Sequence, residues 1–194
     1  MILVFIMVLG CSSRYATPDE LIAFVSDPSN GLHPSFEHDG GKVEVSYKPV
    51  DLILLQESEG RNVSQLAIDS LRKSYSAYYY FVVSFSNNGR EALHSRSPNE
   101  YGELISTLSF RMHEFVNMTT SEGDKIPVAD FVLNRTYGMA GSTDLMVVFS
   151  RKKEKDPSWI QVNINEFGLG IGNLRFRFES DDLDDVPEIA FSII

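Results

Sequence analysis

Two segments near the C-terminal end alternate regularly between apolar and polar residues. The sequences IQVNI (160–164) and LRFRF (174–178) place every apolar side chain on one face and every polar side chain on the other. This period of two is typical of a strand with one face in the core and one in water. The glycine-rich run FGLGIG (167–172) lies between them. The two segments are therefore predicted to be partners in a hairpin.

Other segments predict further strands. Residues 43–47 alternate in the same way, and residues 77–86 (AYYYFVVSFS) contain no polar residue between Tyr80 and Ser84. A run so rich in aromatic and β-branched residues is typical of a central strand that is buried on both faces. Three more strands are predicted around 108–112, 131–133 and 145–149. The fold class predicted is mainly β, an immunoglobulin-like β-sandwich of about seven strands.

An N-terminal helix and one or two shorter helices accompany these strands. Thr17-Pro18-Asp19-Glu20 is a capping box with proline at the first helical position, and the helix is predicted to end near Asp27. Residues 51–57 (DLILLQE) fit a helix or a strand, and we favour a helix. Residues 63–75 carry small and apolar residues at helical spacing. The segment DDLDDVPEI (181–189) is predicted to be a short acidic helix or a loop.

The first ten residues, MILVFIMVLG, are uncharged and apolar up to Gly10. As a helix they would extend about 15 Å, roughly half of a bilayer's hydrocarbon core. The segment is too short to span a membrane and fits the apolar region of a secretory signal peptide. A positively charged start is absent, since the first basic residue is Arg14. A start codon upstream of Met1 would explain this, and so would a different N-terminal anchor.

The residues Val8-Leu9-Gly10-Cys11 resemble the lipobox of bacterial lipoproteins. The resemblance implies that residues 1–10 are a signal peptide and that the thiol of Cys11 receives the lipid. Cys11 is the only cysteine, so an intramolecular disulfide is impossible. The alternative is a buried cysteine that follows a hydrophobic strand. We predict a lipidated tether over 11–17 and a single β-sandwich-like domain over 18–194.

The chain is acidic, with a net charge of −10 and a pI near 4.8. Such a surface repels phosphate backbones, which argues against nucleic-acid binding. It gives no electrostatic attraction to anionic lipid, so acyl chains must supply the membrane affinity, about 0.8 kcal/mol per buried methylene. Ser12, rather than aspartate, follows the cysteine, which is compatible with outer-membrane sorting. The protein is therefore expected to be exported and lipid-anchored to the cell envelope, with the outer membrane favoured.

The three glycines Gly168, Gly170 and Gly172 invite comparison with a nucleotide-binding loop. The dinucleotide fingerprint requires G-x-G-x-x-G between a strand and a helix, so that the helix terminus holds phosphate. Here the spacing differs and a strand follows. We interpret the run as a hairpin connection.

The histidines are candidate metal ligands, and they are His33, His38, His94 and His113. Glu37-His38-Asp39 is a cluster of possible ligands, yet no H-x-x-x-H or H-E-x-x-H spacing occurs. Solvated loop histidines are the favoured interpretation, and a site assembled from distant loops remains open.

Four aspartates near the C-terminus form a second candidate metal site: Asp181, Asp182, Asp184 and Asp185. Several carboxylates together suit a hard cation such as calcium. The ligand order of an EF-hand is absent, so a solvated acidic segment is favoured. No cofactor is predicted, and calcium at this segment is the alternative.

No enzymatic signature is present in the sequence. No serine stands in G-x-S-x-G, the strained turn that activates the nucleophile of esterases. Four tyrosines suggest a different role, an aromatic platform for a sugar: Tyr75, Tyr78, Tyr79 and Tyr80. A central strand that buries its aromatic residues explains them more simply. We therefore predict a protein without catalytic activity.

Residues 18–57, which include PDELIAFVSDPSNGL and YKPVDLILLQE, are similar to uncharacterised envelope lipoproteins. FVLNRTYGM (131–139) and LMVVFSR (145–151) share the similarity. It implies no activity and no functional residues. The prediction is a membrane-tethered envelope lipoprotein that binds or scaffolds another envelope component, most plausibly a protein. The alternative is a periplasmic or surface hydrolase, or a carbohydrate-binding module.

Overall fold

The computed structural model describes residues 15–58, 63–93, 96–136, 139–152 and 155–191. Eight strands form one antiparallel sheet in the order β10-β9-β6-β7-β8-β4-β3-β2, and the short β5 pairs with β4. A separate parallel pair, β1 and β11, joins the two ends of the described chain. The strands are β1 (Tyr15–Ala16), β2 (Ser35–His38), β3 (Gly41–Tyr47), β4 (Tyr78–Asn87), β5 (Arg90–Glu91), β6 (Val116–Thr120), β7 (Lys125–Asn134), β8 (Thr143–Ser150), β9 (Trp159–Ile164), β10 (Leu174–Glu179) and β11 (Glu188–Ile189).

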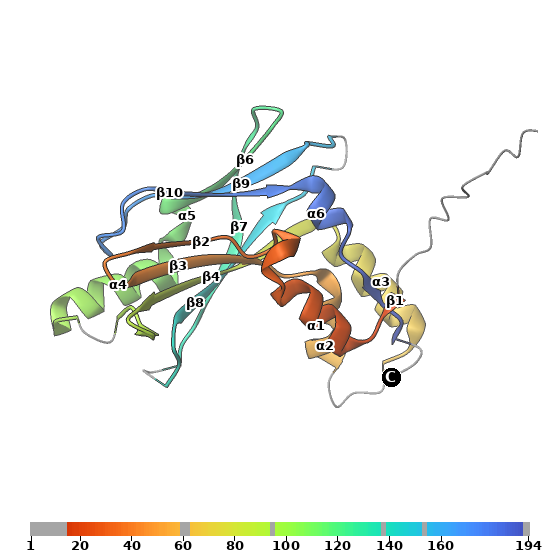
Figure 1. Cartoon of the computed structure of the whole chain (residues 1–194), viewed down its shortest axis with the longest axis horizontal. Helices are drawn as coiled ribbons and strands as arrows, with labels where there is room; N and C mark the ends of the chain where they lie inside the picture. The colour runs from red at the N-terminus through yellow and green to blue at the C-terminus, as the bar shows by residue number, and fades with distance from the viewer. Residues whose placement is uncertain (1–14, 59–62, 94–95, 137–138, 153–154, 192–194) are drawn as a thin grey trace, which may run out of the picture.

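Helices gather at the two ends of the sheet. Figure 1 shows α1, α2 and α3 beside β1 at one end and α4 at the other. A short 3₁₀ helix (Pro28–Asn30) follows α1. The α-helices are α1 (Pro18–Ser26), α2 (Val50–Ser58), α3 (Gln65–Tyr75), α4 (Pro98–Phe110), α5 (Met112–Phe115) and α6 (Ser180–Asp184).

The predicted hairpin of the two alternating segments is confirmed. β9 and β10 pair in antiparallel register, with Ile164 opposite Leu174 and Ile160 opposite Phe178. The apolar side chains are buried, and the polar side chains between them are half-buried or exposed. A period-2 pattern therefore identified both the strands and the face that enters the core.

β4 is a central strand, as predicted, with β3 on one side and β8 on the other. Its inward residues, among them Phe81 and Val83, are fully buried. The outward side is only half-buried, which differs from the predicted burial on both faces. α3 covers that side near Tyr80, whose ring centroid lies 6.2 Å from that of Tyr75, whereas Ser84 stays half-buried.

β7 connects the two halves of the sheet. Its first residues pair with β6, where Asn117 lies opposite Pro127, and its later residues pair with β8. The register shifts between Val128 and Asp130, an irregularity of the kind that bends a strand. The prediction of a mainly β fold is confirmed, but the strands form one continuous sheet rather than the two sheets of an immunoglobulin-like sandwich. Local alternation reveals a strand, and it reveals the partner only where a short turn joins the two strands, because pairings such as β6 with β9 and β4 with β8 depend on contacts distant in sequence.

The core lies between the two ends of this curved sheet. The ring centroid of Phe81 on β4 lies 4.9 Å from that of Phe178 on β10 and 6.1 Å from that of Phe149 on β8. All three side chains are almost completely buried. β10, at one edge of the sheet, thus packs on β4 through side chains rather than backbone hydrogen bonds.

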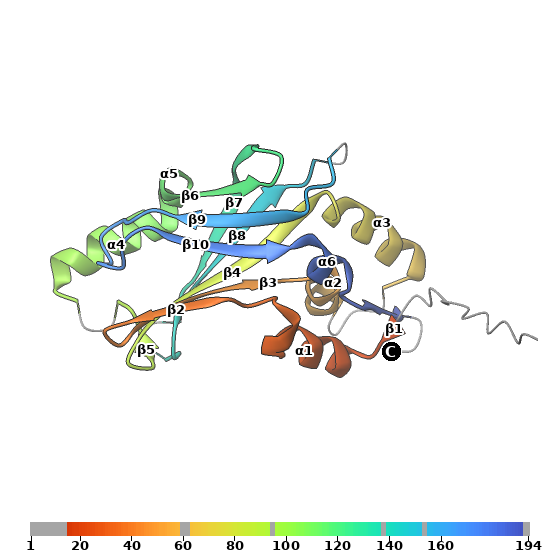
Figure 2. The same cartoon turned by 45° about the horizontal axis from the view of Figure 1, so that its top comes forward.

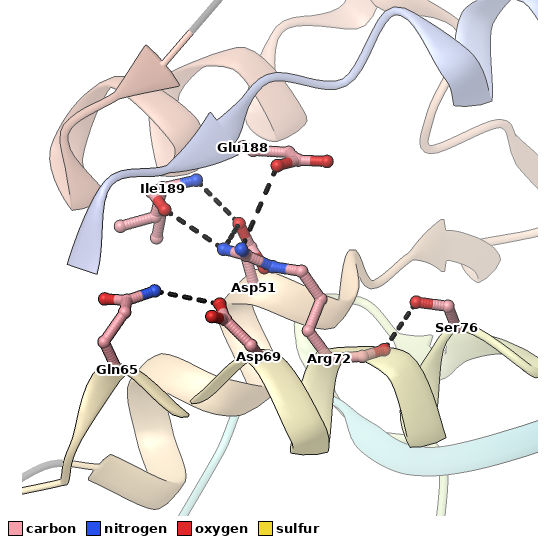
Figure 3. Close-up of polar contacts among 7 residues, drawn as sticks. All are labelled: Asp51, Gln65, Asp69, Arg72, Ser76, Glu188 and Ile189. Atoms are coloured by element: carbon pink, nitrogen blue, oxygen red, sulfur yellow. Dashed lines mark hydrogen bonds and ion pairs between the residues drawn. The ribbon is translucent and has the colours of Figure 1, made fainter. Parts of the chain in front are cut away.

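A buried ion pair ties the helices to the C-terminal strand (Figure 3). Asp51 on α2, whose exposed fraction is 5%, accepts two hydrogen bonds from the guanidinium of Arg72 on α3, at 2.8 and 2.9 Å. The same carboxylate accepts the backbone N–H of Ile189 at 2.6 Å, and Arg72 donates to the Ile189 carbonyl oxygen at 3.1 Å. These four hydrogen bonds, which we call the Asp51–Arg72 clamp, hold β11 where it pairs with β1. The clamp therefore links the two ends of the described chain.

The predicted helices before residue 76 are confirmed as α1, α2 and α3, and the acidic segment contains α6. Thr17 and Glu20 form the predicted capping box. The strand predicted around 108–112 is wrong, because those residues end α4 and begin α5. Leu108 and Met112 are buried four residues apart, which is helical spacing, while Phe110 between them is 73% exposed.

Candidate functional site

A groove of about 700 Å³ opens at the end of the sheet that carries α4. It lies between α4, the two residues Arg111 and Phe115 that flank and end α5, and the turn that joins β9 to β10 (residues 165–173). This volume is within the usual range of ligand sites. The residues that line this α4 groove are Glu100, Gly102, Glu103, Leu104, Ser106, Thr107, Arg111, Phe115, Glu166, Phe167 and Gly168.

α4 forms one wall, and its N-terminus is held by a capping box. The Ser97 hydroxyl accepts the N–H of Glu100, and the Glu100 carboxylate accepts the Ser97 N–H at 3.0 Å. Pro98 occupies the first helical position, which suits its fixed φ. Hydrogen bonds from the hydroxyl and the backbone of Ser97 hold the pKa of Glu100 below its ordinary value. This carboxylate is therefore ionised at neutral pH.

The helical period decides which residues of α4 face the groove. Leu104 and Leu108, one turn apart, are 4% and 1% exposed and attach the helix to the core. Glu103 and Ser106 are exposed and line the groove. One helix thus supplies both the attachment and the polar wall.

The opposite wall is a turn organised around the carboxylate of Glu166. The N–H groups of Gly168, Gly170 and Gly172 donate to it at 2.7, 2.9 and 2.6 Å. All three glycines have positive φ, which lets alternate N–H groups point at one carboxylate. Burial raises the pKa of Glu166, but these bonds and the N–H of Ile171 together hold the pKa below its ordinary value.

Apolar and polar contacts fix this turn against the rest of the molecule. The ring centroid of Phe167 lies 5.5 Å from that of Phe85 and 6.0 Å from that of Phe115. Arg96 donates a hydrogen bond to the Leu169 carbonyl oxygen at 2.9 Å. The wall is therefore in place before a ligand arrives, which reduces the ordering entropy that binding must overcome.

Charge in the groove is negative. Three glutamates line it, and its arginine, Arg111, is already paired with Glu114 through bonds of 2.9 and 2.7 Å. Leu104, Phe115 and Phe167 supply apolar surface beside these charges. A lining of this kind attracts a cationic ligand that also has an apolar part.

Two carboxylates of the groove, those of Glu100 and Glu166, are poorly suited to acid catalysis. A general acid needs a pKa raised toward neutrality so that it holds its proton at working pH. Glu100 and Glu166 have pKa values held below the ordinary value by hydrogen bonds to the ionised form. Their arrangement favours binding of a positive group over proton donation.

Cys11, the predicted lipidation site, lies outside the described residues, and so does the whole leader. Within the described part of the chain, no helix is long and apolar enough to cross a membrane.

The described histidines do not come together. His94 lies outside the described residues. The other three lie on separate segments with different neighbours. His33 Nε2 is 3.1 Å from the Ser26 carbonyl oxygen, and His38 Nε2 is 3.3 Å from the carboxylate of Asp39. The His113 ring centroid is 6.1 Å from that of Phe131.

The acidic C-terminal segment is divided between α6 and the residues that follow it. Asp184 lies 3.6 Å from the guanidinium of Arg151, which partly neutralises it. Among the residues that the structure describes, no three His, Cys, Asp or Glu side chains are placed to hold a metal ion.

The four tyrosines do not share one face. Tyr79 points into the core with an exposed fraction of 6%. Tyr75, Tyr78 and Tyr80 form an aromatic cluster on the outer side, where the ring centroid of Tyr80 lies 6.2 Å from that of Tyr75 and 6.4 Å from that of Tyr78.

The residues of the α4 groove were not found from the sequence. Ser97-Pro98-Asn99-Glu100 has the same capping signature as Thr17-Pro18-Asp19-Glu20. The start of α4 could therefore have been predicted from the sequence. The role of Glu166 had a weaker signal, a carboxylate followed by three glycines at alternate positions. Gly168, Gly170 and Gly172 do form the predicted connection between hairpin strands.

No protein-family model matches the chain, and no curated protein matches it. Two solved structures are similar to it in backbone. One is a DUF4426 family protein from Pseudomonas aeruginosa, with a TM-score of 0.39 and 10% identity, covering 76% of this chain and 91% of that one. The other is a protein of unknown function from Burkholderia pseudomallei, with a TM-score of 0.45 and 8% identity, covering 87% of this chain and 88% of that one.

Proposed function

We propose that the protein is a non-catalytic binding module, tethered to the bacterial cell envelope through lipidated Cys11. Its α4 groove receives a cationic, partly apolar segment of another envelope protein. The observation that carries this proposal is the groove itself, in which three glutamates stand beside two phenylalanines and a leucine.

Charge complementarity supports a cationic occupant. The three lining glutamates outnumber the one lining arginine, which is engaged by Glu114. Glu100 and Glu166 accept hydrogen bonds from within the chain, so Glu103 is the lining carboxylate most available to a ligand. The chain as a whole carries a net charge of −10, which adds a long-range attraction for a basic partner. Apolar surface next to these charges suits the aliphatic stems of lysine and arginine and an aromatic neighbour.

The position of the groove is compatible with a tether at the N-terminus. β1 begins at Tyr15, four residues after Cys11. Figure 1 shows β1 at the opposite end of the molecule from α4. A lipid on Cys11 would hold the β1 end near the membrane, with the groove facing away from it. Tethering raises the local concentration of the module, so a modest affinity for a neighbouring protein suffices.

A defined peptide tests the groove. The full-length protein is titrated with the blocked peptide Lys-Phe-Lys-Phe-Lys and with Glu-Phe-Glu-Phe-Glu, and binding is followed by calorimetry at an ionic strength of about 0.15 M, where the Debye length is about 8 Å. The lysine peptide is expected to bind and the glutamate peptide is not. Glu103→Lys should weaken binding of the lysine peptide roughly fivefold or more, because it replaces an attraction with a repulsion.

Glu37→Lys is the matched control, since Glu37 is exposed on β2 and does not line the groove. It makes the same change in net charge without altering the lining of the groove, and at this ionic strength it is expected to leave the affinity within about twofold. Equal weakening by both variants would mean that only net charge matters, and the proposed groove would be rejected.

Metabolic labelling tests the tether. Labelled palmitate is expected to enter the wild-type protein and not Cys11→Ala, because Cys11 is the only thiol in the chain. Equal labelling of both proteins, or of neither, would contradict the proposed anchor.

A further inference from the structure

The outer side of β6, β9 and β10 is a second surface, separate from the α4 groove. Along each strand, alternate residues are buried and the intervening ones are half-buried or exposed. Figure 2 shows β9 and β10 with no described helix drawn over them. The outward residues that form what we call the amide face are Asn117 and Thr119 on β6, Gln161 and Asn163 on β9, and Arg175 and Arg177 on β10. Glu179 of β10, opposite Trp159, and Lys125 of β7, opposite Thr119, are exposed on the same side at its border.

Strand pairing aligns these residues in two rows. One row contains Arg177, Gln161 and Thr119, and the other contains Arg175, Asn163 and Asn117. Neighbouring strands lie about 4.8 Å apart, so each row extends roughly 10 Å across the sheet. The amide face is thus an array of hydrogen-bonding groups, bordered on β10 by two arginines and, at the end of the strand, by Glu179.

Hydrogen bonds between the side chains fix the orientation of the amides. The Asn163 amide nitrogen lies 3.2 Å from both Asn117 Oδ1 and Thr119 Oγ1. Gln161 Nε2 donates to Asn163 Oδ1 at 2.7 Å. Within the described chain, Asn117 Nδ2 and Gln161 Oε1 have no hydrogen-bond partner. One amide donor and one amide acceptor on this side are therefore available to a ligand.

Two arginines border the amides on a chain that is otherwise strongly acidic. Arg175 is exposed and has no ion-pair partner within the described residues. The guanidinium of Arg177 lies 4.1 Å from the ring centroid of Trp159, a stacking contact that restrains it. A guanidinium binds a carboxylate through paired hydrogen bonds. The border of the face is accordingly suited to a carboxylate.

We propose that the amide face binds a carboxylate-bearing polysaccharide. Sugar hydroxyls both donate and accept hydrogen bonds, which suits the outward donor of Asn117 and the outward acceptor of Gln161. The carboxylates of the polymer meet Arg175 and Arg177. The site uses none of the groove residues, so it extends the proposed function without depending on it.

A protein partner fits this face less well than a glycan. Protein interfaces are anchored by aromatic and other apolar side chains in their centre. Among the described residues of the face and its immediate border on β9, Trp159 is the one aromatic side chain, and Arg177 lies over its ring. The groups of this face that are left to contact a ligand are therefore polar.

The chain's single tryptophan allows a direct test, because Trp159 stands beside the amide face. The full-length protein, in detergent micelles, is titrated with galacturonic acid hexamer, cellohexaose and glutamate hexamer while Trp159 emission is recorded. The galacturonic acid hexamer is expected to produce a saturable change, with an affinity at least about tenfold higher than that of cellohexaose, since only the former offers carboxylates to the arginines.

Two variants with the same loss of charge complete the test. Arg175→Gln should weaken binding of the galacturonic acid hexamer about tenfold, and it removes no side-chain hydrogen bond or ion pair within the described residues. Arg90→Gln, on the exposed start of β5, should leave the affinity within about twofold.

Three results would overturn the proposal. The first is that the galacturonic acid hexamer gives no saturable response, or that Arg175→Gln and Arg90→Gln lower the affinity for it equally. The second is equal affinity for cellohexaose, which would remove the role of the carboxylates. The third is equal affinity for glutamate hexamer, which would assign the face to an acidic peptide instead.

Discussion

Replacing Glu166 by glutamine tests whether its carboxylate organises the wall of the α4 groove. Glutamine keeps the size of the side chain but removes the charge and one acceptor oxygen. In the wild type, the N–H groups of Gly168, Gly170 and Gly172 all donate to this carboxylate, at 2.6 to 2.9 Å. In Glu166→Gln at least one of these donors faces an NH₂ group and loses its acceptor.

The size of the effect follows from the three hydrogen bonds. A bond to a charged acceptor contributes roughly 1.5–3 kcal/mol and a neutral one roughly 0.5–1.5 kcal/mol, so each bond loses about 1 kcal/mol. Three bonds would give about 3 kcal/mol. Because the turn is partly exposed, water compensates some of this loss, and we expect the free energy of unfolding to fall by about 2 kcal/mol.

Urea unfolding, followed by the emission of Trp159, measures this difference at pH 7. Trp159 begins β9, the strand that leads into the turn, so its emission reports on the relevant part of the sheet. Glu103→Gln is the matched control, because Glu103 is an exposed groove carboxylate for which no backbone hydrogen bond holds the side chain. Its effect should stay within about 0.5 kcal/mol.

The pH dependence gives an independent check. The folded-state pKa of Glu166 is lowered, so the ionised side chain stabilises the folded protein above its unfolded pKa of about 4.3. That stabilisation is lost as the pH falls through the folded pKa. The difference between wild type and Glu166→Gln should therefore be constant above about pH 5 and shrink below about pH 4. A variant as stable as the wild type at pH 7, or a difference that grows toward low pH, would refute the reasoning.

Two further predictions concern buried polar groups. Asp51→Ala should lower the free energy of unfolding, measured by urea denaturation, by about 3 kcal/mol, because it leaves the guanidinium of Arg72 without its buried carboxylate. A loss below about 1 kcal/mol would show that the Asp51–Arg72 clamp contributes little to stability. Thr143→Val should leave the melting temperature unchanged or raise it, since the Thr143 hydroxyl is buried with no hydrogen-bond partner among the described residues. Thr120→Val, the matched control, should lower the melting temperature by about 2–4 °C, because it removes the acceptor of the Asp124 N–H. The reverse order of the two threonine variants in differential scanning calorimetry would contradict this account.

Much of the secondary structure could be predicted because it is determined by local patterns. The Thr17–Glu20 capping box and the alternation in 160–164 and 174–178 predicted elements that the structure contains. The strand predicted at 108–112 failed because three apolar residues at alternate positions resemble a strand face. In that segment Leu108 and Met112 are buried at helical spacing and Phe110 is exposed.

The arrangement of the sheet and the α4 groove could not be predicted in the same way. β6 pairs with β9 and β4 pairs with β8, so these two pairings join strands that are distant in sequence. The groove combines Glu103 of α4 with Glu166 of a turn more than sixty residues later. No local pattern links these two positions, because their proximity results from the packing of α4 against the turn between β9 and β10.

The most direct test of the proposed groove is a charge swap between protein and peptide. Glu103→Lys is titrated with Glu-Phe-Glu-Phe-Glu, the peptide that the wild-type protein is expected to reject. If the α4 groove is the binding site, the swapped pair should regain at least part of the affinity of wild type for Lys-Phe-Lys-Phe-Lys, while Glu37→Lys with the glutamate peptide should not. Recovery in both variants, or in neither, would contradict the claim that this groove selects a cationic partner.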